Sequence, residues 1–365
     1  MRIAIVKQKI TTVPQDSFAG YIETMLEEVA ISMKYEVLFW VKGMKADAIP
    51  ANAVIIIETD ASSRFGLKWF YEVHLPSIIK KTGTELLVHL DGCLSLAIKQ
   101  PQWLLASGAS SQAATTARQT YIEKKAAAFF SKAAGIISPA ESIKTALAAT
   151  VTDHSKVIVI PPAAKEFYKM VEWEQKELLK AEYSAGNEYF LVHHEFTSQE
   201  ELLQLLKAFS VFKKWQQSGM KLLIVGGPLF EESSKSKEKF TSYKYRDDVK
   251  WIDHLPEERY AQMLACSYTF IHIDPFGNDL ISLAQAAASG AAVIANATPL
   301  YKEIYGEALI YNEDNDPQTL GNNMVRVYKN EQLRNLNIRS AMETARSFVY
   351  DEQLKKLQQL FFAGK

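Results

Sequence analysis

Apolar runs of strand length alternate with amphipathic segments along the first half of the chain, a pattern typical of parallel α/β sheets. Several runs, such as AVIIIE at 53–58, are apolar without interruption, which indicates strands buried on both faces. Strands are predicted at 2–6, 35–41, 53–58, 85–90, 102–105, 135–138 and 157–160. Helices are predicted at 21–32, 65–81, 115–134 and 140–150, and the three aromatic residues Trp69, Phe70 and Tyr71 are expected to be packed in the core or between domains.

The dipeptide Pro161-Pro162 interrupts this alternation, and the alternation then restarts. Strands are predicted at 189–192, 221–225, 249–252, 268–273, 291–296 and 308–311, with helices at 172–183, 199–217, 257–265, 279–289, 317–329 and 331–346. The final segment, 351–362, carries an apolar face and needs a surface to pack on. The predicted fold is therefore α/β: two Rossmann-like doubly wound domains facing a cleft, 1–162 with the C-terminal helix 348–362 packed back on it, and 163–347.

Size, charge and cysteine content narrow the class of protein. A chain of 365 residues with 48% hydrophobic content suits two domains. The net charge of −1 does not favour nucleic acid as a partner. Cys93 and Cys266 lie far apart with no metal-type spacing, so we expect two buried thiols and no metal. The N-terminus lacks the apolar core of a signal peptide, and no apolar window reaches the length of a transmembrane helix. We expect a cytoplasmic protein.

The stretch FIHIDPFGNDLISLAQAAASG at 270–290 is the best candidate for a binding site. It predicts a buried strand, a polar turn and the N-terminus of a helix, the arrangement in which backbone N–H groups commonly hold a phosphate. Asp279 or Asn278 is suited to cap this helix, which would occupy the same donors. Asp274 is either a turn residue or a functional acid, and His272 is either a core histidine or a ligand contact.

The second half resembles the GT-B glycosyltransferases of family 4, the glycosyl transferases group 1, which transfer a sugar from a nucleotide-sugar with retention of configuration. The resemblance runs through YFLVHHEF at 189–196, KLLIVGG at 221–227, DDVKWIDHLPEERYAQML at 247–264 and ASGAAVIANATPLYKEIYGEAL at 288–309. In the first half, FAGYIETMLEEV at 18–29 is similar to the start of the family's first helix. The resemblance implies that the second domain binds the donor and the first the acceptor.

The residues that carry chemistry in the family are replaced here. The resemblance places Gln199 and Glu200 where the family has an Arg and a Lys on the donor phosphates. It places Gly277 and Gln285 where the family has two glutamates, near the transferred sugar and on the nucleotide ribose. A His-Asp pair near the acceptor corresponds to Ser107 and Gly108. Because charge-assisted contacts are worth about 1.5–3 kcal/mol each, losing the two cations lowers the expected rate by roughly a thousandfold.

The expected donor-binding set is Gln199, Glu200, Asp274, Asp279, Ser282, Gln285 and His194, with Ser107 and Gly277 at the family's catalytic positions and the catalytic residues themselves unassigned. The first hypothesis is a retaining glycosyltransferase that uses a nucleotide-sugar, a saccharide or glycolipid acceptor and no cofactor. The alternative is an inactive homologue that serves as a binding or scaffolding subunit, for instance beside an active paralogue. An epimerase of the same fold is the third hypothesis.

Overall fold

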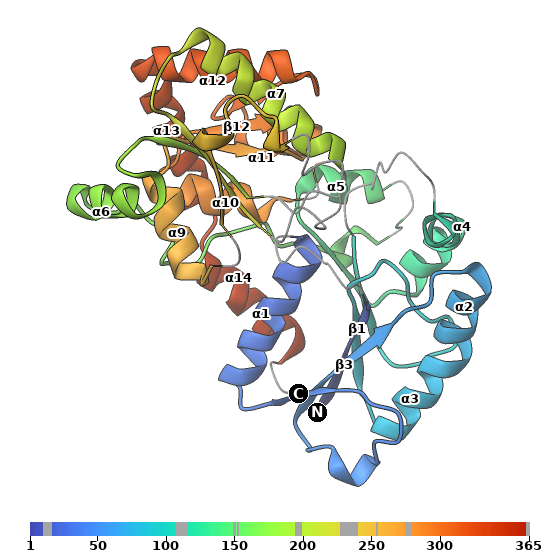
Figure 1. Cartoon of the computed structure of the whole chain (residues 1–365). Coiled ribbons are helices and arrows are strands. Elements are labelled where there is room, and N and C mark those ends of the chain that lie inside the picture. Colours follow the sequence, from blue (N-terminus) through green and yellow to red (C-terminus); the bar gives the residue numbers. More distant parts are fainter. Residues whose placement is uncertain are drawn as a thin grey trace. The chain divides into compact units, whose positions relative to one another are not determined.

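A computed structural model describes residues 1–9, 17–106, 116–148, 151, 153–193, 199–226, 240–252, 255–274, 277 and 279–362. The chain divides into two compact units (Figure 1). The first unit comprises Met1–Pro162 together with Asp351–Lys365, and the second unit comprises Ala163–Tyr350. No described helix is long and apolar enough to cross a membrane. Cys93 and Cys266 are both buried free thiols, as the sequence predicts.

The described part of the first unit holds a parallel sheet of seven strands in the order β2-β3-β1-β4-β5-β6-β7. The strands are β1 (Arg2–Gln8), β2 (Glu36–Phe39), β3 (Ala53–Thr59), β4 (Leu86–His89), β5 (Gln102–Leu105), β6 (Gly135–Ser138) and β7 (Val157–Val159). In the central pair, Ile5 of β1 stands opposite Ile56 of β3. Residues 3–6 of β1 and 53–57 of β3 are buried on both faces, which explains why these stretches are apolar without interruption.

Helices cover both faces of this sheet. They are α1 (Phe18–Ser32), α2 (Arg64–Trp69), α3 (Leu75–Thr82), α4 (Ala117–Lys132) and α5 (Glu141–Leu147), with short 3₁₀ turns η1 (Ala46–Ala48) and η3 (His154–Lys156). Figure 1 shows α1 on one face of the sheet, and α2 and α3 on the other. Helix α1 begins where the Ser17 hydroxyl accepts the Gly20 N–H, and α4 begins in the same way at Thr116.

The helix predicted at 65–81 is not uniform. A π-helical segment, η2 (Phe70–His74), separates α2 from α3. The left-handed residue Gly83 (φ 63°) ends α3. Phe70 and Tyr71 are packed in the core as predicted, whereas Trp69 is 49% exposed and lies outside the core of the first unit.

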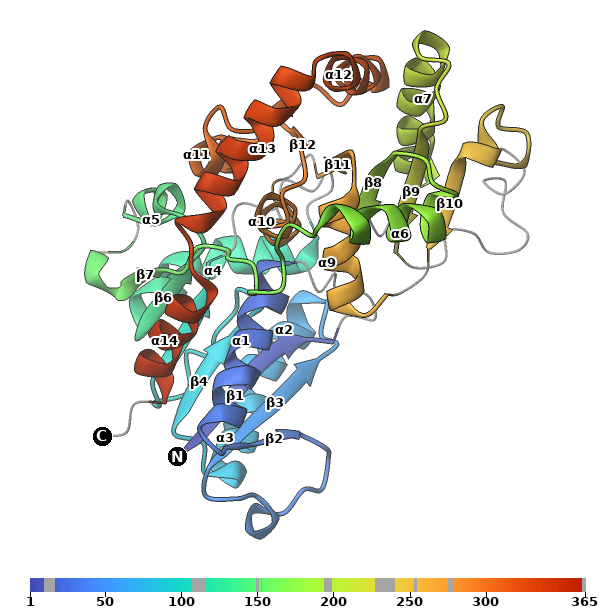
Figure 2. The ribbon, with the colours of Figure 1, turned by 90° about the vertical axis from the view of Figure 1, so that its left-hand side faces the viewer.

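The C-terminal helix α14 (Tyr350–Phe361) contributes side chains to the first unit. The ring of Phe361 meets that of Trp103 edge-on with the centroids 4.9 Å apart, and Phe362 meets Tyr35 at 5.1 Å. Figure 2 shows α14 beside α1, in front of the strands of this unit. A shallow groove between these two helices is lined by Glu28 and Ser32 of α1 and by Asp351 and Lys355 of α14.

The described part of the second unit holds a parallel sheet of six strands in the order β10-β9-β8-β11-β12-β13. The strands are β8 (Tyr189–His193), β9 (Lys221–Val225), β10 (Val249–Ile252), β11 (Thr269–His272), β12 (Val293–Asn296) and β13 (Ile310–Asn312). Strand β11 lies in the middle of the sheet, between β8 and β12, with Phe270 opposite both Leu191 and Val293. The predicted strands are all present, each shifted by no more than two residues at either end.

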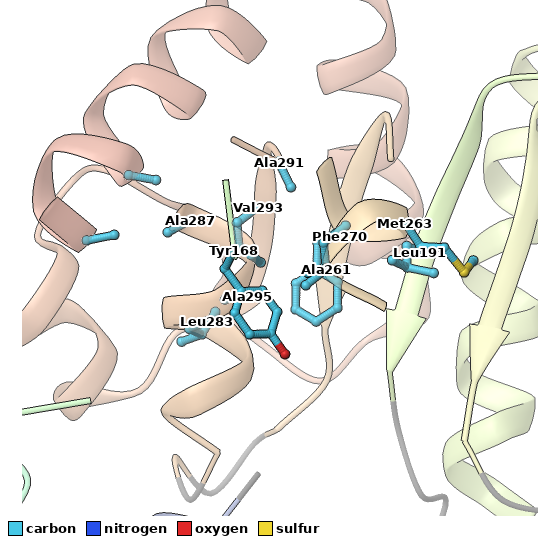
Figure 3. Packing of buried hydrophobic residues seen from close by; sticks show 14 of the residues in the cluster. Tyr168, Leu191, Ala261, Met263, Phe270, Leu283, Ala287, Ala291, Val293 and Ala295 are labelled. Atoms are coloured by element: carbon cyan, nitrogen blue, oxygen red, sulfur yellow. The ribbon is translucent and has the colours of Figure 1, made fainter. Parts of the chain in front are cut away.

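The helices of the second unit are α6 (Trp173–Ser184), α7 (Gln199–Trp215), α9 (Glu257–Cys266), α10 (Ile281–Ala288), α11 (Pro299–Tyr305), α12 (Pro317–Lys329) and α13 (Glu331–Arg346), with the 3₁₀ turn η4 (Arg246–Asp248). Helix α10 starts two residues later than predicted. Helix α11 is not among the predicted helices. One core cluster packs α9 and α10 against the sheet, and Figure 3 shows Met263, Leu283, Ala287 and Phe270 in it.

Candidate functional site

The turn between β11 and α10 is built around the carboxylate of Asp274. Its Oδ1 accepts the N–H of Gly277 at 3.1 Å, and its Oδ2 accepts the N–H of Asp279 at 2.7 Å. Gly277 adopts φ 74°, a left-handed conformation that a residue with a side chain adopts only at a cost. Asp274 therefore acts as the turn residue of the sequence interpretation, and both of its oxygens are engaged by the backbone.

Tyr301, which lies in α11 between β12 and β13, also contacts Asp274. Its hydroxyl lies 2.5 Å from Asp274 Oδ2 and 3.0 Å from His272 Nε2. With the hydroxyl proton donated to the carboxylate, Nε2–H of His272 donates to the hydroxyl oxygen. Burial, together with the neighbouring Asp274 and Asp279 carboxylates, raises the pKa of Tyr301 well above its ordinary value. The His272 side chain is thus buried and hydrogen-bonded to Tyr301 through Nε2.

The carboxyl end of β12 supports the same turn. Asn296 Oδ1 accepts the N–H of Asp274 at 2.8 Å, and its Nδ2 donates to Asn315 Oδ1 at 2.9 Å. Thr298 caps α11 by accepting the N–H of Tyr301 at 3.2 Å. Two adjacent strand ends are therefore joined by side-chain to backbone hydrogen bonds, which fixes the position of the N-terminus of α10.

At the start of α10, Asp279 Oδ1 accepts the N–H of Ser282 at 2.9 Å, as the sequence predicts for a capping residue. Behind this cap lie two buried polar atoms, Ser282 Oγ and Gln285 Oε1, which have no hydrogen-bond partner among the described residues. Buried polar groups are nearly always hydrogen-bonded in folded proteins. Ser282 and Gln285, both in α10, therefore each keep a polar atom that can take up a ligand contact.

The structure brings together only part of the expected donor-binding set. Asp274, Gly277, Asp279, Ser282 and Gln285 share the β11–α10 connection. Gln199 and Glu200 form the first turn of α7, where only their backbone is described. His194 and Ser107, with Gly108, lie outside the described residues, and so does Asn278. Within the described residues, there is no group of three or more His, Cys, Asp or Glu side chains placed to hold a metal ion.

A second polar cluster, which the sequence analysis missed, follows β4 in the first unit. Asp91 accepts a hydrogen bond from the Tyr71 hydroxyl and another from the N–H of Cys93. Arg118 Nη2 of α4 pairs with Asp91 Oδ2 at 2.7 Å, and both side chains are largely buried. Burial and the Asp91 charge raise the pKa of Tyr71 well above its ordinary value. An acid two residues beyond a buried strand was the signal available for Asp91.

His89 is the last residue of β4 and is fully buried. Its Nε2 lies 3.0 Å from Gln102 Oε1, which also accepts the N–H of Ser95, so Nε2 carries the proton. Burial lowers the pKa of His89 from 6.5 to about 4. The ring is therefore a neutral hydrogen-bond donor at physiological pH.

Comparison with known proteins supports the resemblance to glycosyltransferases. Residues 175–344 match the family model described as "Glycosyl transferases group 1". This region covers nearly the whole second unit, so the predicted resemblance to these glycosyltransferases is confirmed. No curated protein sequence matches the chain.

Solved structures resemble the chain over its whole length. WaaG, a glycosyltransferase involved in lipopolysaccharide biosynthesis, superposes with a TM-score of 0.73 at 12% identity, covering 99% of this chain and 100% of that one. HepE of Anabaena in complex with UDP-glucose gives 0.68 at 15% identity, covering 99% of each chain. A glycosyltransferase from Rickettsia africae gives 0.68 at 15%, covering 98% and 97%. At these identities the likeness shows the fold, and the predicted α/β class with two Rossmann-like units is confirmed.

Proposed function

We propose that this protein transfers a sugar from a nucleotide-sugar donor to a saccharide or glycolipid acceptor with retention of configuration. The donor binds to the second unit at the carboxyl end of β11, and the first unit binds the acceptor. The family match of the second unit and the fold shared with HepE, which was solved with UDP-glucose, support the donor class. In a retaining reaction of this kind the leaving diphosphate can itself accept the acceptor proton, so few protein acids are needed.

The observation that carries this proposal is the buried Gln285 Oε1 behind the N-terminus of α10, which accepts no hydrogen bond from the part of the chain that the structure describes. A buried amide oxygen is an acceptor for a ribose hydroxyl, the role that the family resemblance gives to a glutamate at this position. The neighbouring Ser282 Oγ has no partner among the described residues either, and it supplies a donor for a phosphate or ribose oxygen. Together they provide contacts that survive the replacement of the family's charged residues.

Calorimetric titration with UDP-, GDP- and ADP-sugars tests the donor. We expect binding of one of them, weakened about 3–10-fold in Gln285→Leu, which removes one hydrogen bond. Gln204→Leu is the matched control, because Gln204 of α7 also has a buried oxygen without a partner among the described residues.

The variant Gln199→Arg with Glu200→Lys restores the family's cations and should tighten binding. Absence of binding by every nucleotide-sugar at millimolar concentration would refute the donor proposal.

One observation favours the alternative of an inactive homologue. The backbone donors of Gly277, Asp279 and Ser282, which would otherwise hold a phosphate, are occupied by the carboxylates of Asp274 and Asp279. A protein that binds a nucleotide-sugar but neither transfers nor hydrolyses its sugar would be a binding subunit. Single-turnover incubation with a radiolabelled nucleotide-sugar distinguishes the two functions, since any released nucleoside diphosphate requires cleavage of the sugar–phosphate bond.

A further inference from the structure

The outer face of the helical segment from α2 to α3 exposes large apolar side chains. Phe65 is 80% exposed, Trp69 49% and Val73 58%. The opposite face of the same segment is also apolar, since Leu67, Tyr71, Leu75, Ile78 and Ile79 pack into the core of the first unit. A helix on the surface of a soluble protein normally presents polar residues outward. This segment instead exposes three large apolar side chains among the polar residues of its outer face.

The π-helical turn places these exposed side chains in line. In an α-helix of 3.6 residues per turn, each step of four residues drifts around the axis in one direction. The wider turn of η2 (Phe70–His74) takes more residues and offsets that drift, so that Phe65, Trp69 and Val73 form one stripe. The Trp69 ring is held on the surface by stacking on His74, with the centroids 4.9 Å apart and the planes 12° from parallel.

Leu96 extends the stripe from the loop after β4. Its N–H donates to Glu72 Oε1 at 3.1 Å, which ties this loop to the helical segment, and its side chain is 36% exposed. Glu72 is the only acidic residue between Ser62 and Thr82. Its carboxylate is thus engaged by the backbone beside the stripe.

The charge of this face is positive. Arg64, Lys68, Lys80 and Lys81 are all exposed, and none of them forms an ion pair with any part of the chain that the structure describes. The chain as a whole carries a net charge of −1, so these cations are a local concentration and not part of a general basic field. We name this surface the α2–α3 patch: Phe65, Trp69, Val73 and Leu96 with Arg64, Lys68, Lys80 and Lys81.

We propose that the α2–α3 patch binds the surface of membranes that contain anionic lipids. Aromatic side chains of this kind insert between lipid headgroups, and exposed cations are attracted to the negative surface potential. Single exposed apolar residues are normal, but a contiguous exposed stripe marks an interaction surface. The cations beside the aromatic residues favour an anionic bilayer, because its surface is negative throughout, whereas the core of a protein–protein interface is depleted of charged residues. This proposal does not depend on the donor site of the second unit.

Flotation of the full-length protein with vesicles tests the proposal. We expect it to bind vesicles of phosphatidylcholine mixed with phosphatidylglycerol and to bind vesicles of phosphatidylcholine alone much more weakly. Phe65→Ser with Trp69→Ser should lower partitioning roughly tenfold or more, since two apolar side chains no longer leave water. Lys80→Gln with Lys81→Gln should lower it by about fivefold per charge removed, and added salt should reduce this difference.

The matched control is Trp173→Ser with Leu178→Ser, which removes an exposed aromatic and an exposed aliphatic side chain from α6 of the second unit. This variant should partition as the wild type does. Thermal unfolding of each variant verifies that the exposed substitutions leave the fold intact. The proposal is overturned if the wild type does not float with anionic vesicles, or if the Phe65 and Trp69 variant floats as well as the wild type.

Discussion

The two sheets carry the same local arrangement at the carboxyl end of one strand. In the first unit β4 ends at His89 and Asp91 follows, and in the second unit β11 ends at His272 and Asp274 follows. Both histidines are buried, and in both units a tyrosine hydroxyl from a neighbouring helical segment donates to the aspartate. The partners that complete each cluster differ. Arg118 pairs with Asp91, whereas backbone N–H groups of the following turn bind Asp274.

This difference shows what each aspartate does. An ion pair with Arg118 links β4 to α4, two elements far apart in the sequence, so Asp91 contributes to the packing of the first unit. The backbone N–H groups that donate to the Asp274 carboxylate lie only three and five residues ahead, so this aspartate shapes a local turn and positions the N-terminus of α10, while the Tyr301 hydroxyl ties the turn to α11. The second arrangement places backbone and side-chain groups at the sheet edge where ligands bind in open α/β folds.

The largest effect should come from breaking the ion pair of the first unit. Arg118→Met removes the cation and leaves the Asp91 carboxylate buried without it, which typically costs about 3–5 kcal/mol. Denaturant unfolding followed by tryptophan fluorescence measures the loss. The matched control is Arg259→Met, because Arg259 pairs with Glu182 at an exposed position where the expected loss is under about 1 kcal/mol. Equal losses in the two variants would show that Asp91 does not depend on Arg118.

A second effect concerns His89 and acid pH. The folded protein holds the pKa of His89 at about 4, below the value of 6.5 that applies when the residue is exposed. Between these values the unfolded chain binds a proton that the folded chain excludes, so stability rises with pH through this window and is constant above it. Acidification from pH 7.5 to pH 4 should therefore cost about 3 kcal/mol from this residue, at 1.36 kcal/mol per unit.

His89→Gln isolates that contribution. The amide can still donate to Gln102 Oε1 but does not titrate. The unfolding free energy of the wild type minus that of the variant should therefore fall by about 3 kcal/mol as the pH falls from 7.5 to 4. Because the carboxylates titrate in both proteins, only this difference is informative. A difference that stays constant across the range would mean that His89 takes up its proton in the folded state as easily as in the unfolded chain.

The sequence predicts the fold well because buried parallel strands leave an unmistakable apolar signal. All seven strands of the first unit and all six of the second, as the structure describes them, fall within predicted strands or close to them. Helix α11 was missed although Thr298-Pro299 is a typical helix start. Its residue Tyr301 was missed with it, because a contact with Asp274 27 residues earlier follows from the order of strands and not from local spacing.

The candidate site was predicted less completely than the fold. The capping role of Asp279 follows from local sequence, and so does the turn at Asp274. The pairing of Asp91 with Arg118 joins residues on either side of β5, so no local pattern reveals it. Likewise, the outward face of Trp69 depends on the π-helical turn, whereas three adjacent aromatic residues alone suggest a buried cluster.

The smallest effect that sharpens the comparison concerns Gly277, where the family resemblance places a glutamate. At φ 74° any side chain is strained by about 1–2 kcal/mol. A Cβ at this position would also lie 3.1 Å from Thr298 Oγ1, the atom that caps α11 and so positions Tyr301. The Asp274 turn therefore disfavours any side chain at position 277, including the glutamate that the family resemblance places there.

Gly277→Ala tests this reasoning against Gly43→Ala. Gly43 has φ 95° but no heavy atom within 4 Å of the added Cβ, so that variant carries backbone strain alone. We expect Gly277→Ala to lose about 1 kcal/mol more than Gly43→Ala in denaturant unfolding, because Thr298 must also shift. If the two variants lose the same stability, the Thr298 side chain can shift away from the added Cβ at no measurable cost. The turn would then tolerate a side chain at position 277, and the missing glutamate would need an explanation other than the conformation of the Asp274 turn.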